Sequence, residues 1–158
     1  TGSLGHGLSV GCGISLSAKL NSEEFRTFVL VGDGECNEGS IWEAAMFAPH
    51  HKLDNLIVFI DYNKLQSLES THLTLNLEPF ADKWRSFGWE VFQIDGHNHS
   101  EIYHSVNNMD SSNGKPKCII ADTVKGKGVS FMENKVLWHY RSPKGGEYSE
   151  ALKELSNK

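Results

Sequence analysis

The sequence has few cysteines, no long apolar run and no excess of positive charge. Its 158 residues include three cysteines, too few and too scattered for a disulfide framework or a zinc site. Apolar runs reach only strand length, as at residues 56–60, so no membrane span is predicted. A net charge of -5 without a basic cluster argues against nucleic-acid binding. With no signal peptide visible, we expect a cytoplasmic protein that binds neither nucleic acid nor membrane.

What remains is the composition of an ordinary globular domain. Hydrophobic residues make up 39% of the chain and charged residues 22%. The length suits one domain with a substantial core, so we treat residues 1–158 as a single domain. In such a core, Cys12 and Cys118 are expected to pack as small hydrophobic residues. Because residue 1 is a threonine, we expect the chain to be part of a longer protein or a split subunit.

Apolar runs alternate with helix-like stretches along the chain. Strands are expected at residues 25–31, 56–61, 89–94 and 117–123, and helices at residues 4–20, 40–51, 78–87, 100–108 and 147–155. Ser40 is a plausible cap for the second helix, and Pro79 fits the start of the third. The strands are apolar throughout, which is typical of a parallel sheet covered by helices on both faces. The sequence therefore predicts an α/β fold that binds ligands at the carboxyl ends of its strands.

A polar residue follows each of the first two expected strands. Asp33 lies in Gly32-Asp33-Gly34, and Asn63 comes after the second strand, with 28 residues between it and Gly34. In a parallel βαβ unit, both side chains reach the same edge of the sheet. Carboxylate and amide oxygens suit Mg²⁺, which commonly shares its coordination shell with phosphate oxygens. The two glycines let the backbone approach a diphosphate closely, so the pattern predicts a metal site that carries a diphosphate.

These residues and their neighbours resemble the transketolase family. Gly-Asp-Gly followed at this spacing by asparagine is the thiamine diphosphate signature. Five segments of the sequence are similar to transketolase motifs in the same order, at residues 1–9, 32–45, 77–84, 95–97 and 123–129. The resemblance implies a thiamine diphosphate-binding fold of the diphosphate-binding (PP) type. It also implies transfer of a two-carbon ketol unit from a ketose phosphate to an aldose phosphate, with thiamine diphosphate and Mg²⁺ (or Ca²⁺ or Mn²⁺) as cofactors.

The resemblance also assigns roles to individual residues. It places the metal ion on Asp33, Asn63 and the backbone carbonyl of Leu65. It gives Gly34 and Glu35 backbone contacts with the diphosphate. The full set of cofactor-binding residues that it implies is Gly2, Leu4, Gly32, Asp33, Gly34, Glu35, Asn63 and Leu65.

Two further residues are expected to act in catalysis. The glutamate that matches Glu38 lies at the subunit interface of transketolases, in a carboxylate network that links two active sites. The histidine that matches His139 reaches the diphosphate and the substrate side of the cofactor. Lys125 and Lys127 could screen phosphate charge or sit solvated on a loop, and we favour a structural or gating role for both.

The sequence departs from the family pattern at two places near the expected site. Tyr140 follows His139 where the family carries glycine. Residues 66–69 read Gln-Ser-Leu-Glu where most transketolases have Gln-Ile-Asp-Gly. The second change lies near the cofactor ring and the entrance, so it could alter which sugar is accepted.

A complete transketolase needs parts that the sequence lacks. The glutamate that activates the cofactor belongs to a pyrimidine-binding domain, for which 158 residues leave no room. The resemblance therefore implies the amino-terminal subunit of a split transketolase, with a carboxy-terminal partner in a homodimeric or α₂β₂ heterotetrameric assembly. Two alternatives stay open. One is another thiamine diphosphate enzyme, for a modified or nucleotide-linked sugar or similar to deoxyxylulose phosphate synthase. The other is a non-catalytic cofactor-binding or assembly subunit.

Overall fold

The computed structural model describes residues 2–110 and 112–156. A four-stranded sheet lies at its centre, formed by β1 (Thr27–Gly32), β2 (Leu56–Tyr62), β3 (Glu90–Asp95) and β4 (Lys117–Asp122). All neighbouring strands are parallel, in the order β1-β2-β4-β3. The predicted parallel α/β fold is confirmed, and each strand begins and ends within two residues of its expected bounds.

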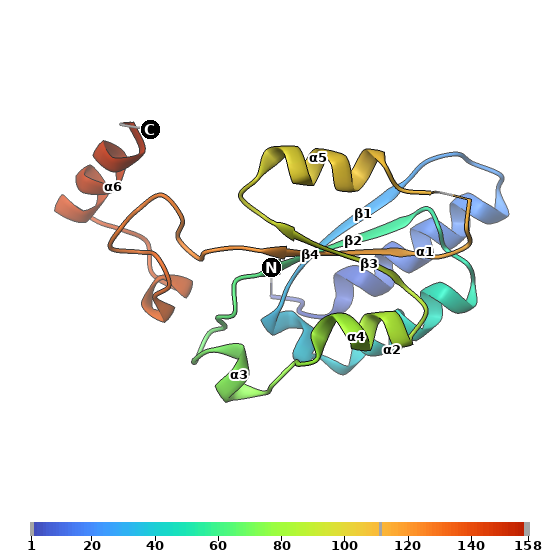
Figure 1. Ribbon diagram of the computed structural model, residues 1–158. Coiled ribbons are helices and arrows are strands. Elements are labelled where there is room, and N and C mark those ends of the chain that lie inside the picture. The colour runs from blue at the N-terminus through green and yellow to red at the C-terminus, as the bar shows by residue number, and fades with distance from the viewer. Residues whose placement is uncertain (1, 111, 157–158) are drawn as a thin grey trace.

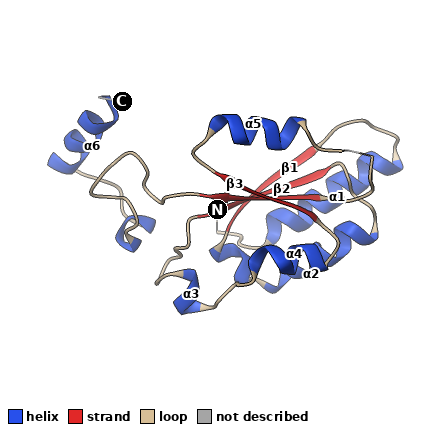
Figure 2. Cartoon of the chain, in the orientation of Figure 1, coloured by secondary structure: helices blue, strands red, loops and turns tan. Residues whose placement is uncertain are grey.

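Helices cover both faces of the sheet (Figure 1). One face carries α1 (His6–Leu20), α2 (Gly39–His50) and α4 (Phe80–Ser86), and the other carries α5 (His99–Asn107). Beyond the carboxyl edge lie the short helices η1 (Gly34–Asn37), α3 (Thr71–Thr74) and η2 (Val136–His139), together with α6 (Gly146–Ser156). Figure 2 shows that loops connect α3 and α6 to the rest of the molecule, whereas η1 directly follows β1. No helix in the described part of the chain is long and apolar enough to cross a bilayer.

The main core lies between the sheet and the three helices on its first face. Trp84 is fully buried there and makes an edge-to-face contact with Trp89 at a ring separation of 5.0 Å. Cys12, Cys36 and Cys118 are buried free thiols, as expected for Cys12 and Cys118. Burial raises the pKa of all three, that of Cys12 to about 11, so the thiols stay protonated and behave as small apolar side chains.

The expected cap of α2 is wrong. The helix begins at Gly39 with Glu38 in the cap position, and Glu38 makes no side-chain capping bond. The Ser40 hydroxyl instead donates to the carbonyl of Gly5 at 3.0 Å. Ser40 therefore joins α2 to the loop before α1 and does not cap its own helix.

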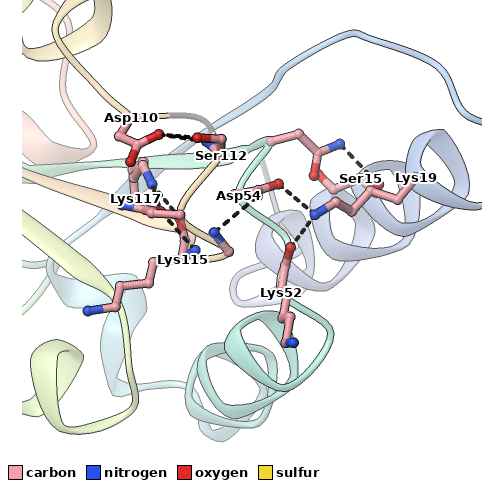
Figure 3. Close-up of polar contacts among 11 residues, drawn as sticks. Ser15, Lys19, Lys52, Asp54, Asp110, Ser112, Lys115 and Lys117 are labelled. Carbon is pink, nitrogen blue, oxygen red and sulfur yellow. Dashed lines mark hydrogen bonds and ion pairs between the residues drawn. The ribbon is translucent and has the colours of Figure 1, made fainter.

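Polar contacts join the elements at the amino edge of the sheet (Figure 3). The Asp54 carboxylate accepts hydrogen bonds from Lys19 of α1 at 2.6 Å and from the Gly114 amide at 3.1 Å. Lys117, at the start of β4, is almost completely buried. Its ammonium donates to Asn113 and to the Lys115 carbonyl, each at 2.6 Å. These contacts hold the edge that lies opposite the expected site.

Candidate cofactor and metal site

A cavity of about 360 Å³ opens at the carboxyl edge of the sheet, where β1 and β2 end. Nine of the ten predicted site residues line it, namely Leu4, Gly32, Asp33, Gly34, Glu35, Glu38, Asn63, Leu65 and His139. The tenth, Gly2, is exposed and lies outside this lining. The parallel register explains the gathering, because it pairs Gly32 with Asp61 and brings the two strand ends side by side.

Asp33 is a buried acid at the base of this cavity. Its side chain accepts hydrogen bonds from the amide of Gly34 at 2.7 Å and from that of Lys64 at 2.5 Å. The second bond ties the loop after β2 to the end of β1. Burial raises the pKa of Asp33 to about 6, against the opposing effect of the two amides and of Lys125. A cation beside the carboxylate would stabilise its charged form.

The loop from Asn63 to Leu65 is shaped by the Asn63 side chain. Its oxygen accepts a hydrogen bond from the Leu65 amide at 3.0 Å, and its nitrogen donates to Asp61 at 3.2 Å. Between them Lys64 adopts a left-handed backbone with φ of 65°, which reverses the chain. Asp33, Asn63 and Leu65 therefore come together in one cavity, although they are far apart in the sequence.

The residues present fit a divalent metal and a diphosphate. Within the described residues, the Asp33 carboxylate has no cationic side chain as a hydrogen-bond or ion-pair partner, although it is only 1% exposed. A Cβ atom on Gly34 would lie 2.8 Å from Cβ of Gln66, so a glycine is needed where the two loops meet. The described chain holds no cluster of three His, Cys, Asp or Glu suited to a metal. An Asp carboxylate, an Asn side chain and a backbone carbonyl do not form such a cluster. Together they would supply three oxygen ligands and leave coordination positions for phosphate oxygens and water.

The two glutamates of the cavity have different surroundings. Glu35 accepts hydrogen bonds from the amides of Gly5 at 2.9 Å and Gly32 at 3.4 Å, so its side chain joins the amino-terminal loop to β1. Because the Glu35 carboxylate is already bonded within the protein, the expected contact with a diphosphate falls to the backbone of Glu35. Glu38 lies at the start of α2, beside Gly5.

The opposite wall of the cavity comes from the chain after β4. His139 ends η2, and its ring lies 4.7 Å from that of Tyr140, which also lines the cavity. Burial lowers the pKa of His139, and the nearby charge of Lys125 lowers it further. The imidazole is therefore neutral at neutral pH and can accept or donate a hydrogen bond.

Among the other lining residues, Gln66 and Ser67 were expected near the cofactor ring and Lys125 was considered for screening phosphate charge. Asn37, Asp61 and Tyr140 were given no role in the site. The sequence could have indicated Asp61, because it is an acidic residue in the second-to-last position of β2, two residues before Asn63. It accepts a hydrogen bond from the Thr123 hydroxyl and one from Asn63, so it positions the loop that carries Asn63. No comparable signal existed for Tyr140, whose position depends on how the chain after β4 folds back.

Comparisons with known proteins agree with this geometry. The family described as transketolase, thiamine diphosphate binding domain, matches residues 1–155. One relative, a subunit of the apulose-4-phosphate transketolase of Phocaeicola vulgatus, is 45% identical over 158 residues, which is 100% of this chain and 56% of that protein. The 6-deoxy-6-sulfo-D-fructose transketolase subunit SqwG of Clostridium sp. (strain MSTE9) is 45% identical over 155 residues, covering 98% and 56% of the two chains.

A solved structure shows the same fold. The transketolase of Campylobacter jejuni superposes with a TM-score of 0.87 at 29% identity, covering 98% of this chain and 24% of that one. The chain thus spans about half the length of the curated relatives named above and about a quarter of this solved transketolase. The match with the family extends over nearly all of the chain, which therefore belongs to the transketolase family through its thiamine diphosphate binding domain.

Proposed function

We propose that this chain is the diphosphate- and metal-binding part of the amino-terminal subunit of a transketolase. The subunit would transfer a two-carbon ketol unit from a ketose phosphate to an aldose phosphate. The observation that carries the proposal is the meeting of Asp33, Asn63 and Leu65 in one cavity at the carboxyl edge of a parallel sheet. Membership of the thiamine diphosphate binding family supports the same conclusion.

Each part of the cavity has a separate task in this proposal. Bound thiamine diphosphate supplies the chemistry that breaks and remakes a carbon–carbon bond. Asp33, Asn63 and the Leu65 carbonyl would hold Mg²⁺, for which Ca²⁺ or Mn²⁺ could substitute, and the backbone of Gly34 and Glu35 would face the diphosphate. The neutral imidazole of His139 would hold a hydrogen bond on the substrate side.

A second protein chain is part of the proposal. The relatives from Phocaeicola vulgatus and Clostridium are named as subunits, and we infer that a carboxy-terminal, pyrimidine-binding subunit completes the site in a homodimeric or α₂β₂ assembly. Glu38 would then take part in a carboxylate network at the interface. Val10 and Ile14, one turn apart on α1, are 60% and 46% exposed, which supports contact of this helix with another protein surface.

We predict that Asp33→Ala abolishes Mg²⁺-dependent binding of thiamine diphosphate. Loss of the buried carboxylate removes a metal ligand, so we expect the affinity to fall at least about tenfold, or about 1.4 kcal/mol. Calorimetric titration of thiamine diphosphate, with and without Mg²⁺, measures the change. Asp95→Ala is the matched control, because Asp95 is the last residue of β3, much as Asp33 directly follows β1, but does not line this cavity. An unchanged affinity of the Asp33 variant would overturn the assignment of the site.

A second candidate is a transketolase for a modified sugar. Two observations favour it. The relatives are named for apulose-4-phosphate and for 6-deoxy-6-sulfo-D-fructose, and Gln66 and Ser67, which lie where the sequence departs from the family pattern, line the cavity. Product analysis with ordinary pentose phosphates and with a panel of branched and modified donors separates the two candidates. Turnover of the ordinary donors alone would exclude the modified-sugar function.

A further inference from the structure

We propose that Tyr62 is a positioning residue that holds Asn63 and Leu65 in place and thereby favours Mg²⁺ over Ca²⁺ at the proposed metal site. The proposal rests on the function proposed above and goes beyond it, because Tyr62 is not a metal ligand and does not line the cofactor cavity. Tyr62 is the last residue of β2 and directly precedes Asn63. It lines two other cavities, of about 570 Å³ and about 260 Å³, so it acts on the metal-ligand loop (residues 63–65) from outside the cofactor site.

The Tyr62 hydroxyl ties the end of β2 to the start of α4. It donates a hydrogen bond to the Glu78 carboxylate at 2.5 Å, and the other oxygen of Glu78 accepts one from the Phe80 amide at 2.9 Å. The bond from Tyr62 and then that from Phe80 lower the pKa of Glu78, so the carboxylate is charged at neutral pH. Hydroxyl-to-carboxylate bonds of this length are roughly twice as strong as bonds between neutral groups. The contact therefore restrains Tyr62 against a helix of the main core.

The aromatic ring of Tyr62 contacts both the core and the metal-ligand loop. Its core neighbour is Phe80, which is buried and has its ring 5.7 Å away. Its neighbour in the loop is Lys64, whose ammonium lies 5.1 Å from the ring centre in a cation–π contact and also pairs with Asp122. Because Tyr62 and Lys64 flank Asn63, this contact restrains the chain on both sides of the proposed metal ligand.

The backbone of the metal-ligand loop needs this support. The Tyr62 carbonyl accepts a hydrogen bond from the Thr123 amide at 3.2 Å, which fixes the strand end. Two residues later, Lys64 adopts its left-handed conformation with φ of 65°. Such a conformation is uncommon for a residue with a side chain and persists where surrounding contacts impose it. The contacts of Tyr62 impose it from the strand side of the turn.

A firmly held loop matters more for Mg²⁺ than for Ca²⁺. Mg²⁺ requires a near-regular octahedron with oxygen ligands at about 2.0–2.1 Å, whereas Ca²⁺ accepts variable geometry with ligands at about 2.3–2.6 Å. Two of the three protein ligands of the proposed site, the Asn63 side chain and the Leu65 carbonyl, belong to the loop that Tyr62 restrains. Loosening this loop should therefore weaken Mg²⁺ binding more than Ca²⁺ binding.

The test removes the hydroxyl with Tyr62→Phe in the complete protein, assembled with its partner subunit. Calorimetry measures the affinity for thiamine diphosphate with Mg²⁺ and, separately, with Ca²⁺. We expect the affinity to fall about fivefold or more with Mg²⁺ and by less than about twofold with Ca²⁺. Glu78→Gln should give a smaller shift in the same direction, because the amide oxygen can still accept the bond but carries no charge. Tyr103→Phe is the matched control, since Tyr103 is 64% exposed on α5 and its variant should bind like the wild type with both ions.

Hydrogen exchange of the metal-free protein gives a second readout. The Lys64 and Leu65 amides donate to Asp33 and to the Asn63 side chain, and both should exchange at least about threefold faster in Tyr62→Phe than in the wild type. Equal losses of affinity with the two ions would overturn the proposal, and so would unchanged exchange of these amides. A wild-type protein that binds thiamine diphosphate with neither ion would instead overturn the function on which the proposal rests. Thermal unfolding shows that each variant is folded.

Discussion

At the scale of single residues, the buried carboxylate of Asp33 makes the site sensitive to pH. Its pKa in the folded, metal-free protein is about 6, above the ordinary value of 3.8, because burial disfavours the charged form. The folded state therefore binds more protons than the unfolded state between these two values. The contribution of Asp33 to stability falls as the pH rises through this range and stays at its lowest above it.

Metal binding should show the opposite trend, because the metal requires the ionised carboxylate. We predict that Mg²⁺-dependent cofactor affinity is constant above about pH 6 and falls about tenfold per pH unit below it. Calorimetry from pH 5 to 8 measures this, after correction for the separately measured pH dependence of the Mg²⁺–thiamine diphosphate complex in buffer. An affinity that stays flat down to pH 5 would show that Asp33 is not the titrating ligand.

At the scale of elements, β4 begins with a buried charge. Lys117 is only 1% exposed and has three partners, Asn113, the Lys115 carbonyl and Glu90, the last in an ion pair at 3.1 Å. We predict that Lys117→Ala lowers the free energy of unfolding by about 2 kcal/mol, because it removes a side chain that is almost completely buried, together with its ion pair to Glu90, which is 34% exposed. Urea unfolding checks this value. Lys115→Ala, at an exposed neighbour, should change stability by less than about 0.5 kcal/mol, and similar values for both variants would contradict this expectation.

The elements that the sequence predicts well are those governed by local pattern. The strands are short apolar runs with polar ends, so their bounds were readable, and Gly-Asp-Gly and Asn63 mark the strand ends that form the site. The errors arise where contacts with distant segments determine the local structure. Ser40 bonds to Gly5 in place of its own helix, and α3, capped by the Ser70 hydroxyl, is not among the helices expected from the sequence. Tyr140 belongs to the cavity only because the chain after β4 returns to the sheet.

At the scale of the whole molecule, the proposed function makes the described chain one side of a cofactor site. Its groups suit the diphosphate and the metal, whereas the proposed partner subunit would bind the pyrimidine end. We predict that thiamine diphosphate binds the full-length subunit with Mg²⁺ but at least about tenfold more tightly once the partner is added, because binding then joins contacts from both subunits. Calorimetry with and without the partner tests this. Equal affinities in the two titrations would place all cofactor contacts on this chain and contradict the split site.

The strand order has a consequence for how the molecule is made. β1 and β2 can pair as soon as both have left the ribosome, whereas β3 pairs only with β4 within the described chain and must wait for it. β4 is the last of the described strands to be synthesised, yet it takes a place between two strands made earlier. Lys125, His139 and Tyr140 emerge later still. A nascent chain would therefore present Asp33 and Asn63 well before the opposite wall of their cavity exists, and capture of the proposed cofactor would have to wait for that wall.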